Sequence, residues 1–180
     1  MKIISLETLL TDELKDIYRA ENLMIKALPK MAKAAASTDL RKTFENHLIQ
    51  TQTQAQRLKE IFNDLKLKPK GKNCIGMEGI IDEGKQIIQS DPEEEPLDAA
   101  LIGIAQRLEH YEIACYGTAR AHARQLGFLR IAEVLSKTLE EEKQTDRHLT
   151  FLAENRVNVI ASMSKTGVRS KDRIDITSVE

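Results

Sequence analysis

The sequence of 180 residues has no tryptophan, only two cysteines, and just 4% aromatic residues. It has no uninterrupted apolar run of about eighteen residues, so no membrane-spanning helix is predicted. The cysteines, Cys74 and Cys115, form no CxxC pair. We interpret them as reduced thiols, with a structural disulfide as the less favoured alternative. The N-terminal residues show no hydrophobic signal core, which predicts a cytoplasmic protein with no membrane partner.

Net charge is also nearly absent, at −1 for 27 basic and 28 acidic residues. Nucleic-acid binding usually requires a concentrated positive surface, so we expect no nucleic-acid partner. The sequence contains no Gly-rich phosphate loop, and we can place no Ser-His-Asp or Cys-His arrangement in it. The catalytic residues are therefore unknown from sequence, and whether the protein is an enzyme stays open.

The sequence does contain apolar residues at helical spacing along most of its length. Apolar residues make up 41% and charged residues 31%, as in other soluble helical proteins. The spacing predicts four helices of about 28–30 residues and a shorter one. The long helices are predicted at residues 5–36, 39–66, 97–125 and 128–155, and the short one at residues 77–89. Gly127 is expected to end the third long helix as a C-cap.

The connections between these helices predict the architecture. A tight turn joins the first and second long helices, and another joins the third and fourth. A long connection that carries the short helix joins the two pairs. This order predicts an all-α protein, a ferritin-like four-helix bundle with a crossover connection carrying a short fifth helix. We expect residues 1–155 to form the bundle and residues 156–180, which lack clear periodicity, to form a flexible C-terminal tail.

Three glutamates interrupt the apolar stripes of the long helices. Glu21, Glu112 and Glu142 each occupy a position where steps of three and four residues put apolar side chains on the same face. A lone carboxylate on a buried face costs several kcal/mol unless it is paired, protonated or bound to a cation. Three such interruptions predict one shared metal site in the core of the bundle.

Distances from the turns place these glutamates at a common height. Glu112 lies about fifteen residues before Gly127, so the antiparallel level on the fourth long helix is near Glu142. Glu109 precedes Glu112 by three residues and points to nearly the same face. The four carboxylates, including that of Glu21, would balance two divalent cations. Without a cation they would raise one another's pKa.

The second long helix is the weakest part of the predicted site. Glu21 lies about sixteen residues before the first turn, which places the neutral residues Thr51 and Gln54 at its level. Gln54 is a candidate oxygen ligand. His47 is also a candidate ligand, although we favour a structural role for it. Asp146, on the fourth long helix, could also reach the site.

A buried polar network without metal is the alternative for these carboxylates. In such a network Glu21 would pair with Arg57 or Arg107. We interpret Tyr116 as a core aromatic residue with a satisfied hydroxyl group. We interpret Glu141 as part of a solvated face.

Four segments of the chain carry a resemblance to a known family. They are LLTDELKDIYRAENLMIKALPKMAKAA, CIGMEGIIDEG, DAALIGIAQRLEHYEIACYGT and LSKTLEEEKQTDRHLT. The chain resembles the rubrerythrin/ferritin-like superfamily and, within it, the bacterial YciF-type stress proteins. The resemblance covers nearly all of residues 1–155, and it implies a ferritin-like bundle, a homodimer and a diiron site. Glu21, the pair Glu109 and Glu112, and Glu142 match the rubrerythrin ligand pattern.

The sequence departs from the rubrerythrin pattern in two respects. The Glu-x-x-His of the second rubrerythrin helix falls on Thr51 and Gln54 here. The chain also lacks the rubredoxin-type cysteine module that supplies electrons in rubrerythrin. Peroxidase activity is therefore not implied by the resemblance.

The leading hypothesis is a ferritin-like stress-response metalloprotein with a carboxylate-bridged dimetal site. Its oxygen-rich ligands suit two iron ions, with Mn or Mg as alternatives, and such a site could oxidise Fe(II) with O₂ or peroxide. The alternative is a non-catalytic dimeric helical stress or interaction protein with a degenerate metal site. An iron-storage or DNA-protecting cage is disfavoured by the near-neutral charge and by the expected homodimer.

Overall fold

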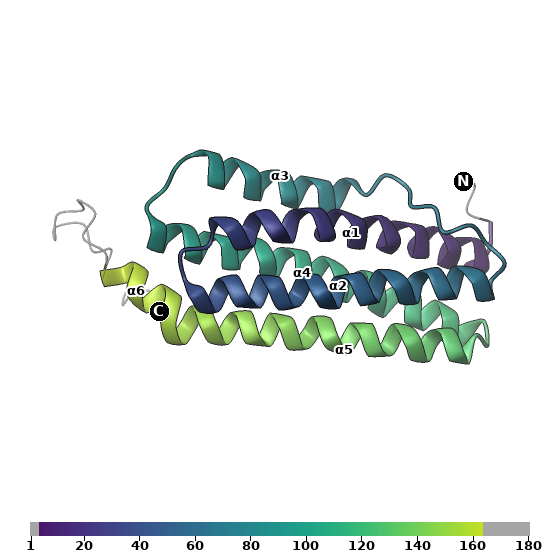
Figure 1. Cartoon of the computed structure of the whole chain (residues 1–180). Helices are drawn as coiled ribbons and strands as arrows, with labels where there is room; N and C mark the ends of the chain where they lie inside the picture. The colour runs from purple at the N-terminus through teal and green to yellow at the C-terminus, as the bar shows by residue number, and fades with distance from the viewer. Residues whose placement is uncertain (1–3, 164–180) are drawn as a thin grey trace, which may run out of the picture.

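The computed structural model describes residues 4–163, and every regular element in that range is helical. Figure 1 shows four long helices that run side by side, with a shorter helix outside them. The bounds are Leu6–Ala34 (α1), Thr38–Asp64 (α2), Ile75–Gln89 (α3), Glu94–Gln125 (α4) and Leu129–Leu152 (α5), then a π-helical turn, Ala153–Val157 (η1), and Asn158–Met163 (α6). None of the helices in this range is long and apolar enough to cross a membrane.

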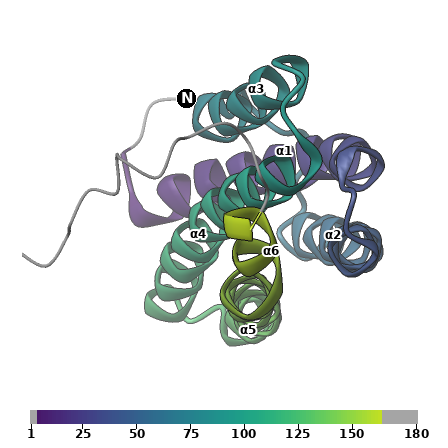
Figure 2. The same cartoon turned by 90° about the vertical axis from the view of Figure 1, so that its left-hand side faces the viewer.

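The four long helices form the predicted ferritin-like bundle, with α1–α2 and α4–α5 as its two hairpins. The crossover between the hairpins carries α3, which packs on α1 and α4 and lies on one side of the bundle (Figure 2). The all-α fold class and the short fifth helix in the crossover are therefore confirmed.

The C-terminal end of the bundle extends past the predicted boundary at residue 155. The π-helical turn η1 and the helix α6 continue the chain to Met163. Val157 is buried in one apolar cluster with Leu149 and Leu152, which keeps this segment on the bundle. One buried residue in this stretch was too weak a pattern to extend the predicted helix. Residues 156–163 are mostly helical, and the rest of the predicted tail, 164–180, lies outside the described residues.

Local signals in the sequence explain where helices begin and end. Ser5 precedes α1, and its hydroxyl accepts a hydrogen bond from the Thr8 amide at 3.1 Å while the Thr8 hydroxyl accepts one from the Ser5 amide at 3.0 Å. Gly127 follows α4 with a φ of 78°, and the amide of Phe128 donates to the carbonyl of Ala123 at 2.9 Å. Gly127 thus ends α4 as predicted.

The core consists of two apolar clusters with a polar layer between them. Along α1, the buried apolar residues from Leu10 to Ile17 belong to one cluster and those from Ala20 to Ala32 belong to the other, and α2, α4 and α5 divide in the same way. The polar layer consists of the buried polar residues at the boundary, namely Glu21, His47, Thr51, Gln54, Glu109, Glu112 and Glu142. Each long helix therefore contributes polar side chains to one level of an otherwise apolar core.

A buried carboxylate outside the polar layer ties the first hairpin to the second. Asp98 on α4 is 4% exposed, and its two carboxylate oxygens accept hydrogen bonds from the backbone amides of Ala36 (2.9 Å) and Ser37 (2.7 Å). Those amides belong to the tight turn between α1 and α2. Asp98 thus fixes this turn against the start of α4, which sets the height of Glu21 relative to Glu112.

Replacing Asp98 with alanine should lower the free energy of unfolding by about 3 kcal/mol, because two hydrogen bonds to a carboxylate, each worth roughly 1.5 kcal/mol, are lost. Asp98→Asn keeps one acceptor oxygen and should cost about half as much. Urea denaturation followed by circular dichroism measures both changes.

Asp82→Ala is the matched control, because it removes an aspartate that makes only an exposed ion pair with Lys85. Its effect should stay below about 0.5 kcal/mol. Equal losses in Asp82→Ala and Asp98→Ala would contradict the role assigned to Asp98.

Candidate metal centre

The polar layer brings four candidate metal ligands together from three helices. One ligand atom from each of His47 (α2), Glu109 and Glu112 (α4), and Glu142 (α5) lies within 4.8 Å of the other three. His47 Nδ1 is 3.3 Å from Glu109 Oε1, and His47 Nε2 is 3.6 Å from Glu142 Oε2. The exposed fraction is 3% for His47 and at most 1% for the three glutamates. We refer to these four residues as the four-residue group.

Helix geometry explains why these glutamate side chains point into the buried core. Glu109 and Glu112 are three residues apart and project from one face of α4. On α5, Leu135 and Leu139 precede Glu142 by seven and three residues, and both are buried in one apolar cluster. The apolar neighbours on the same face therefore carry the glutamates into the core.

Seven polar atoms of the polar layer are buried without a hydrogen-bond partner. They are Glu21 Oε2, His47 Nε2, Gln54 Oε1, both carboxylate oxygens of Glu109, Glu112 Oε1 and Glu142 Oε2. Buried polar atoms are normally hydrogen bonded, and each unsatisfied one costs about 1–3 kcal/mol. Among the other side chains of residues 4–163, only Arg120 Nε and His122 Nδ1 share this condition. This concentration of unsatisfied oxygens fits a site for cations.

Three of the carboxyl groups have a pKa raised well above the ordinary glutamate value. Loss of hydration is the main cause for Glu21, Glu109 and Glu112. Neighbouring negative charge is the next cause, from Glu142 for the first two and from Glu21 for Glu112. Without a cation these groups favour the protonated state. A divalent cation would reverse that preference, because carboxyl groups bind metal in the deprotonated form.

Glu21 is held in the polar layer by Tyr116. The Tyr116 hydroxyl donates a hydrogen bond to Glu21 Oε1, and the Tyr116 side chain is completely buried. Burial and then the charge of Glu21 raise the pKa of Tyr116 well above its ordinary value, so the phenol remains a neutral donor. Sequence reasoning placed Tyr116 in the core but missed its partner. The signal was present, since Tyr116 follows Glu112 by four residues and shares its face of α4.

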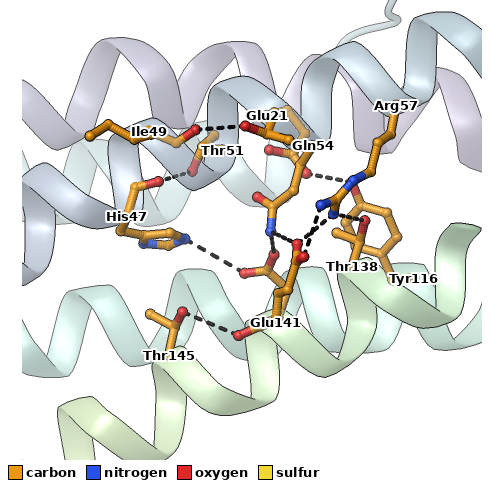
Figure 3. A network of polar contacts seen from close by, with 12 residues as sticks. Glu21, His47, Ile49, Thr51, Gln54, Arg57, Tyr116, Thr138, Glu141 and Thr145 are labelled. Atoms are coloured by element: carbon orange, nitrogen blue, oxygen red, sulfur yellow. Dashed lines mark hydrogen bonds and ion pairs between the residues drawn. The ribbon is translucent and has the colours of Figure 1, made fainter.

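Gln54 and Arg57 of α2 both reach Glu141 of α5 (Figure 3). Gln54 Nε2 donates to Glu142 Oε1 and, at 3.2 Å, to Glu141 Oε2. Arg57 donates two hydrogen bonds to Glu141, at 2.5 and 2.9 Å. Burial raises the pKa of Glu141, but the hydrogen bond and charge of Arg57 outweigh it and lower that pKa below the ordinary value. The prediction that Glu141 lies on a solvated face is therefore wrong. Arg57 pairs with Glu141 and not with Glu21.

Asp146 and Arg107, two further residues singled out from sequence, lie away from the polar layer. Asp146 Oδ1 lies 3.3 Å from His110 Nε2 and accepts a hydrogen bond from Gln106 Nε2 at 3.3 Å. These α4 partners engage the Asp146 carboxylate, which is not part of the four-residue group. Arg107 pairs with Glu83 on the surface at 2.6 Å and is not a partner of Glu21.

His47 occupies a more central place than the structural role favoured from sequence. Its ring is buried between the carboxylates of Glu109 and Glu142 and makes it a member of the four-residue group. The sequence could not reveal this, because His47 lies a full turn from the predicted level of the site on α2.

A polar cavity of about 220 Å³ between α2 and α5 reaches the buried group from the surface. It is lined by Thr43, Asn46, His47, Gln50, Glu141, Gln144, Thr145 and His148. A water molecule occupies about 30 Å³ in the liquid, so several waters fit in this space. The cavity gives hydrated ions and small molecules a route as far as the His47 ring.

The donor set of the polar layer is rich in oxygen. Four carboxylates and one imidazole converge there, and no thiolate is among the candidates. Carboxylate-rich ligation suits hard cations such as Fe, Mn or Mg. The four carboxylates carry the charge that two divalent cations would neutralise. The residues present therefore fit a cation site.

Comparison with known protein families gives a match over most of the chain. The family described as "Domain of unknown function (DUF892)" matches residues 5–162. Protein YciF of Escherichia coli (strain K12) is 43% identical over 159 residues, which cover 88% of this chain and 96% of YciF.

Solved structures share the fold as well. The crystal structure of the E. coli stress protein YciF gives a TM-score of 0.83 at 43% identity, covering 88% of this chain and 99% of that one. YcfI from Rhodopseudomonas palustris, whose description proposes a structural role, gives 0.81 at 42% identity, covering 83% and 95% of the two chains. A Xanthomonas campestris protein at 20% identity shares the fold with a TM-score of 0.70, covering 88% and 98% of the two chains.

Lowering the pH should stabilise the metal-free protein. The raised pKa values of Glu21, Glu109 and Glu112 mean that the folded state holds protons that the unfolded state has released near neutral pH. This contribution is complete below the ordinary glutamate pKa of about 4.3 and is lost as the pH rises through the folded-state values. Urea unfolding between pH 5 and 8 should show a slope of about 1.4 kcal/mol per pH unit for each extra bound proton.

Glu109→Gln is the matched variant for this measurement, because its amide cannot titrate. The variant should show a smaller slope than the unsubstituted protein. Identical slopes for the two proteins would contradict the proton uptake assigned to the polar layer.

Proposed function

The chain belongs to the DUF892 family, and we propose that it is a ferritin-like stress-response metalloprotein that holds two iron ions and oxidises Fe(II). The observation that carries this proposal is the polar layer, where seven buried polar atoms have no hydrogen-bond partner. The description of YciF as a stress protein, at 43% identity, supports the physiological setting.

The residues of the polar layer divide into two parts around the proposed ions. The four-residue group, His47 with Glu109, Glu112 and Glu142, offers ligands for one ion. Glu21 would supply the fourth carboxylate. Together with Glu112 or Glu142, it would hold the second ion. Bound iron would supply one-electron redox chemistry. In the proposed reaction, two Fe(II) ions give two electrons, and one peroxide takes them up with two protons to form two waters.

The surrounding residues control this site without touching the reactants directly. Tyr116 orients Glu21 through its hydrogen bond and, with its raised pKa, holds its proton there. The ion pair of Arg57 with Glu141 joins α2 to α5 beside the polar layer. Gln54 donates to Glu142 and fixes the direction of that carboxylate. The polar cavity at His47 admits a small oxidant such as O₂ or peroxide.

Iron stoichiometry tests whether the polar layer binds metal. After anaerobic loading with Fe(II), the full chain should hold about two ions, because its four buried carboxylates balance two divalent charges. Glu142→Gln removes a shared ligand and should lose at least one ion or weaken binding by at least about tenfold. Mn(II) and Mg(II) loaded in parallel show whether iron is preferred.

Glu140→Gln is the matched control, since Glu140 lies on the same helix but is exposed and pairs with Arg147 at 2.8 Å. It should bind as much iron as the unsubstituted chain. Equal iron content in Glu142→Gln and Glu140→Gln would end the assignment of the polar layer as a metal site.

Oxidation kinetics test the activity separately from binding. Fe(II) added to the protein in the presence of peroxide should oxidise faster than Fe(II) in buffer, and Tyr116→Phe should slow the reaction because Glu21 loses its hydrogen-bond donor. Absorbance of Fe(III) and consumption of the oxidant give the rate, with Glu140→Gln as the control. Iron binding without any acceleration would leave a metal site but remove the proposed activity.

The second candidate is a non-catalytic, dimeric helical stress protein with a degenerate metal site. Two observations favour it: α2 contributes neutral Thr51 and Gln54 to the polar layer, and a structural role is proposed for the relative YcfI. The kinetic experiment separates the two candidates. A homodimeric assembly and a cytoplasmic location stay predictions for this chain.

A further inference from the structure

An apolar cavity of about 170 Å³ lies under the crossover helix, between α1, α3 and α4. None of the residues that line it belongs to the polar layer. Its walls are formed by Leu23, Ala27 and Met31 of α1, by Ile81, Gly84 and Ile88 of α3, and by Ile104 and Leu108 of α4. The cavity is thus separate from the candidate metal centre, and the proposal below does not depend on the metal.

Small residues on two helices shape this cavity. A Cβ atom at Gly84 would lie 3.0 Å from Ile104 Cγ2, so glycine lets α3 approach α4 closely at this point. Opposite, the buried Ala27 of α1 has too short a side chain to fill the remaining space. The approach of α3 to α4 therefore leaves an unfilled space against α1.

The charged residues that line this cavity are all lysines. Lys26 and Lys30 of α1 and Lys85 of α3 surround its opening, and each is exposed. A shallower groove of about 450 Å³ shares Lys30 and Lys85 and adds Lys33. Lys85 makes an exposed ion pair with Asp82 at 2.6 Å, and within residues 4–163 the three α1 lysines make no ion pair. Exposed pairs of this kind are weak, so an anion could replace Asp82.

We propose that this cavity binds a single-chain fatty acid, with the hydrocarbon in the apolar space and the carboxylate at the lysines. The size fits a short or medium chain, because an apolar cavity of about 150 Å³ is known to hold a six-carbon ring. About six to eight carbons would be buried, and the head group would lie in the adjoining groove. A free phosphate would leave the apolar walls unfilled, and a neutral alcohol would leave the lysines without a counter-charge.

Titration calorimetry of the full chain with butanoate, hexanoate, octanoate and decanoate, each below its micelle concentration, tests the proposal. Affinity should rise about fourfold for each added methylene up to octanoate, the increase expected for burying apolar surface, and then level off as the cavity fills. 1-Octanol and inorganic phosphate should each bind at least about tenfold more weakly than octanoate.

Two sets of variants locate the site. Lys30→Gln combined with Lys85→Gln should weaken octanoate binding by about tenfold, whereas Lys42→Gln combined with Lys59→Gln, on the exposed surface of α2, should leave it unchanged. Ala27→Leu should block binding by filling the cavity, and circular dichroism verifies its fold. If Ala27→Leu does not fold, the lysine variants still decide.

Three outcomes would overturn the proposal. They are no binding of octanoate, an affinity independent of chain length, and equal weakening by the two double-lysine variants. Binding to anionic phospholipid vesicles without binding of free octanoate would also overturn it, in favour of a membrane surface.

Discussion

The burial of four carboxylates at one height, between two apolar clusters, is the constraint on which this bundle depends. Glu21, Glu109, Glu112 and Glu142 are at most 1% exposed, so they need protons, hydrogen-bond donors or cations in place of hydration. Tyr116 is the donor that the chain supplies to Glu21, and Gln54 is the donor to Glu142. Both oxygens of Glu109 and one of Glu112 have none. Whether protons or cations satisfy these buried oxygens determines the chemistry of the protein.

Helical periodicity was sufficient to predict the bundle and the height of its glutamates. The interruption of apolar stripes at Glu21, Glu112 and Glu142 locates the polar layer, because helices joined by short turns must align along their length. The same reasoning could not resolve which side chains meet across α2 and α5. Whether His47 or Gln54 faces Glu142 depends on helix tilt and rotation, and these are set by packing and not by spacing along one helix.

Charged neighbours were the least predictable part of the candidate site. Glu141 and Asp146 lie near Glu142 on α5 and are similarly exposed, yet Glu141 pairs with Arg57 of α2 and Asp146 with His110 of α4. The surroundings of the two carboxylates differ because each pairs with a residue on a different helix. Such pairings join residues that are distant in sequence, so the amino-acid sequence alone does not reveal them.

Because α3 packs on one side of the bundle, the two broad sides of the molecule differ. One side is covered by the crossover helix, whereas within residues 4–163 no further helix lies over the side formed by α2 and α5 (Figure 2). The polar cavity that reaches His47 opens on this bare side. A second copy docked on this side would cover the polar cavity and block that route of small molecules to His47.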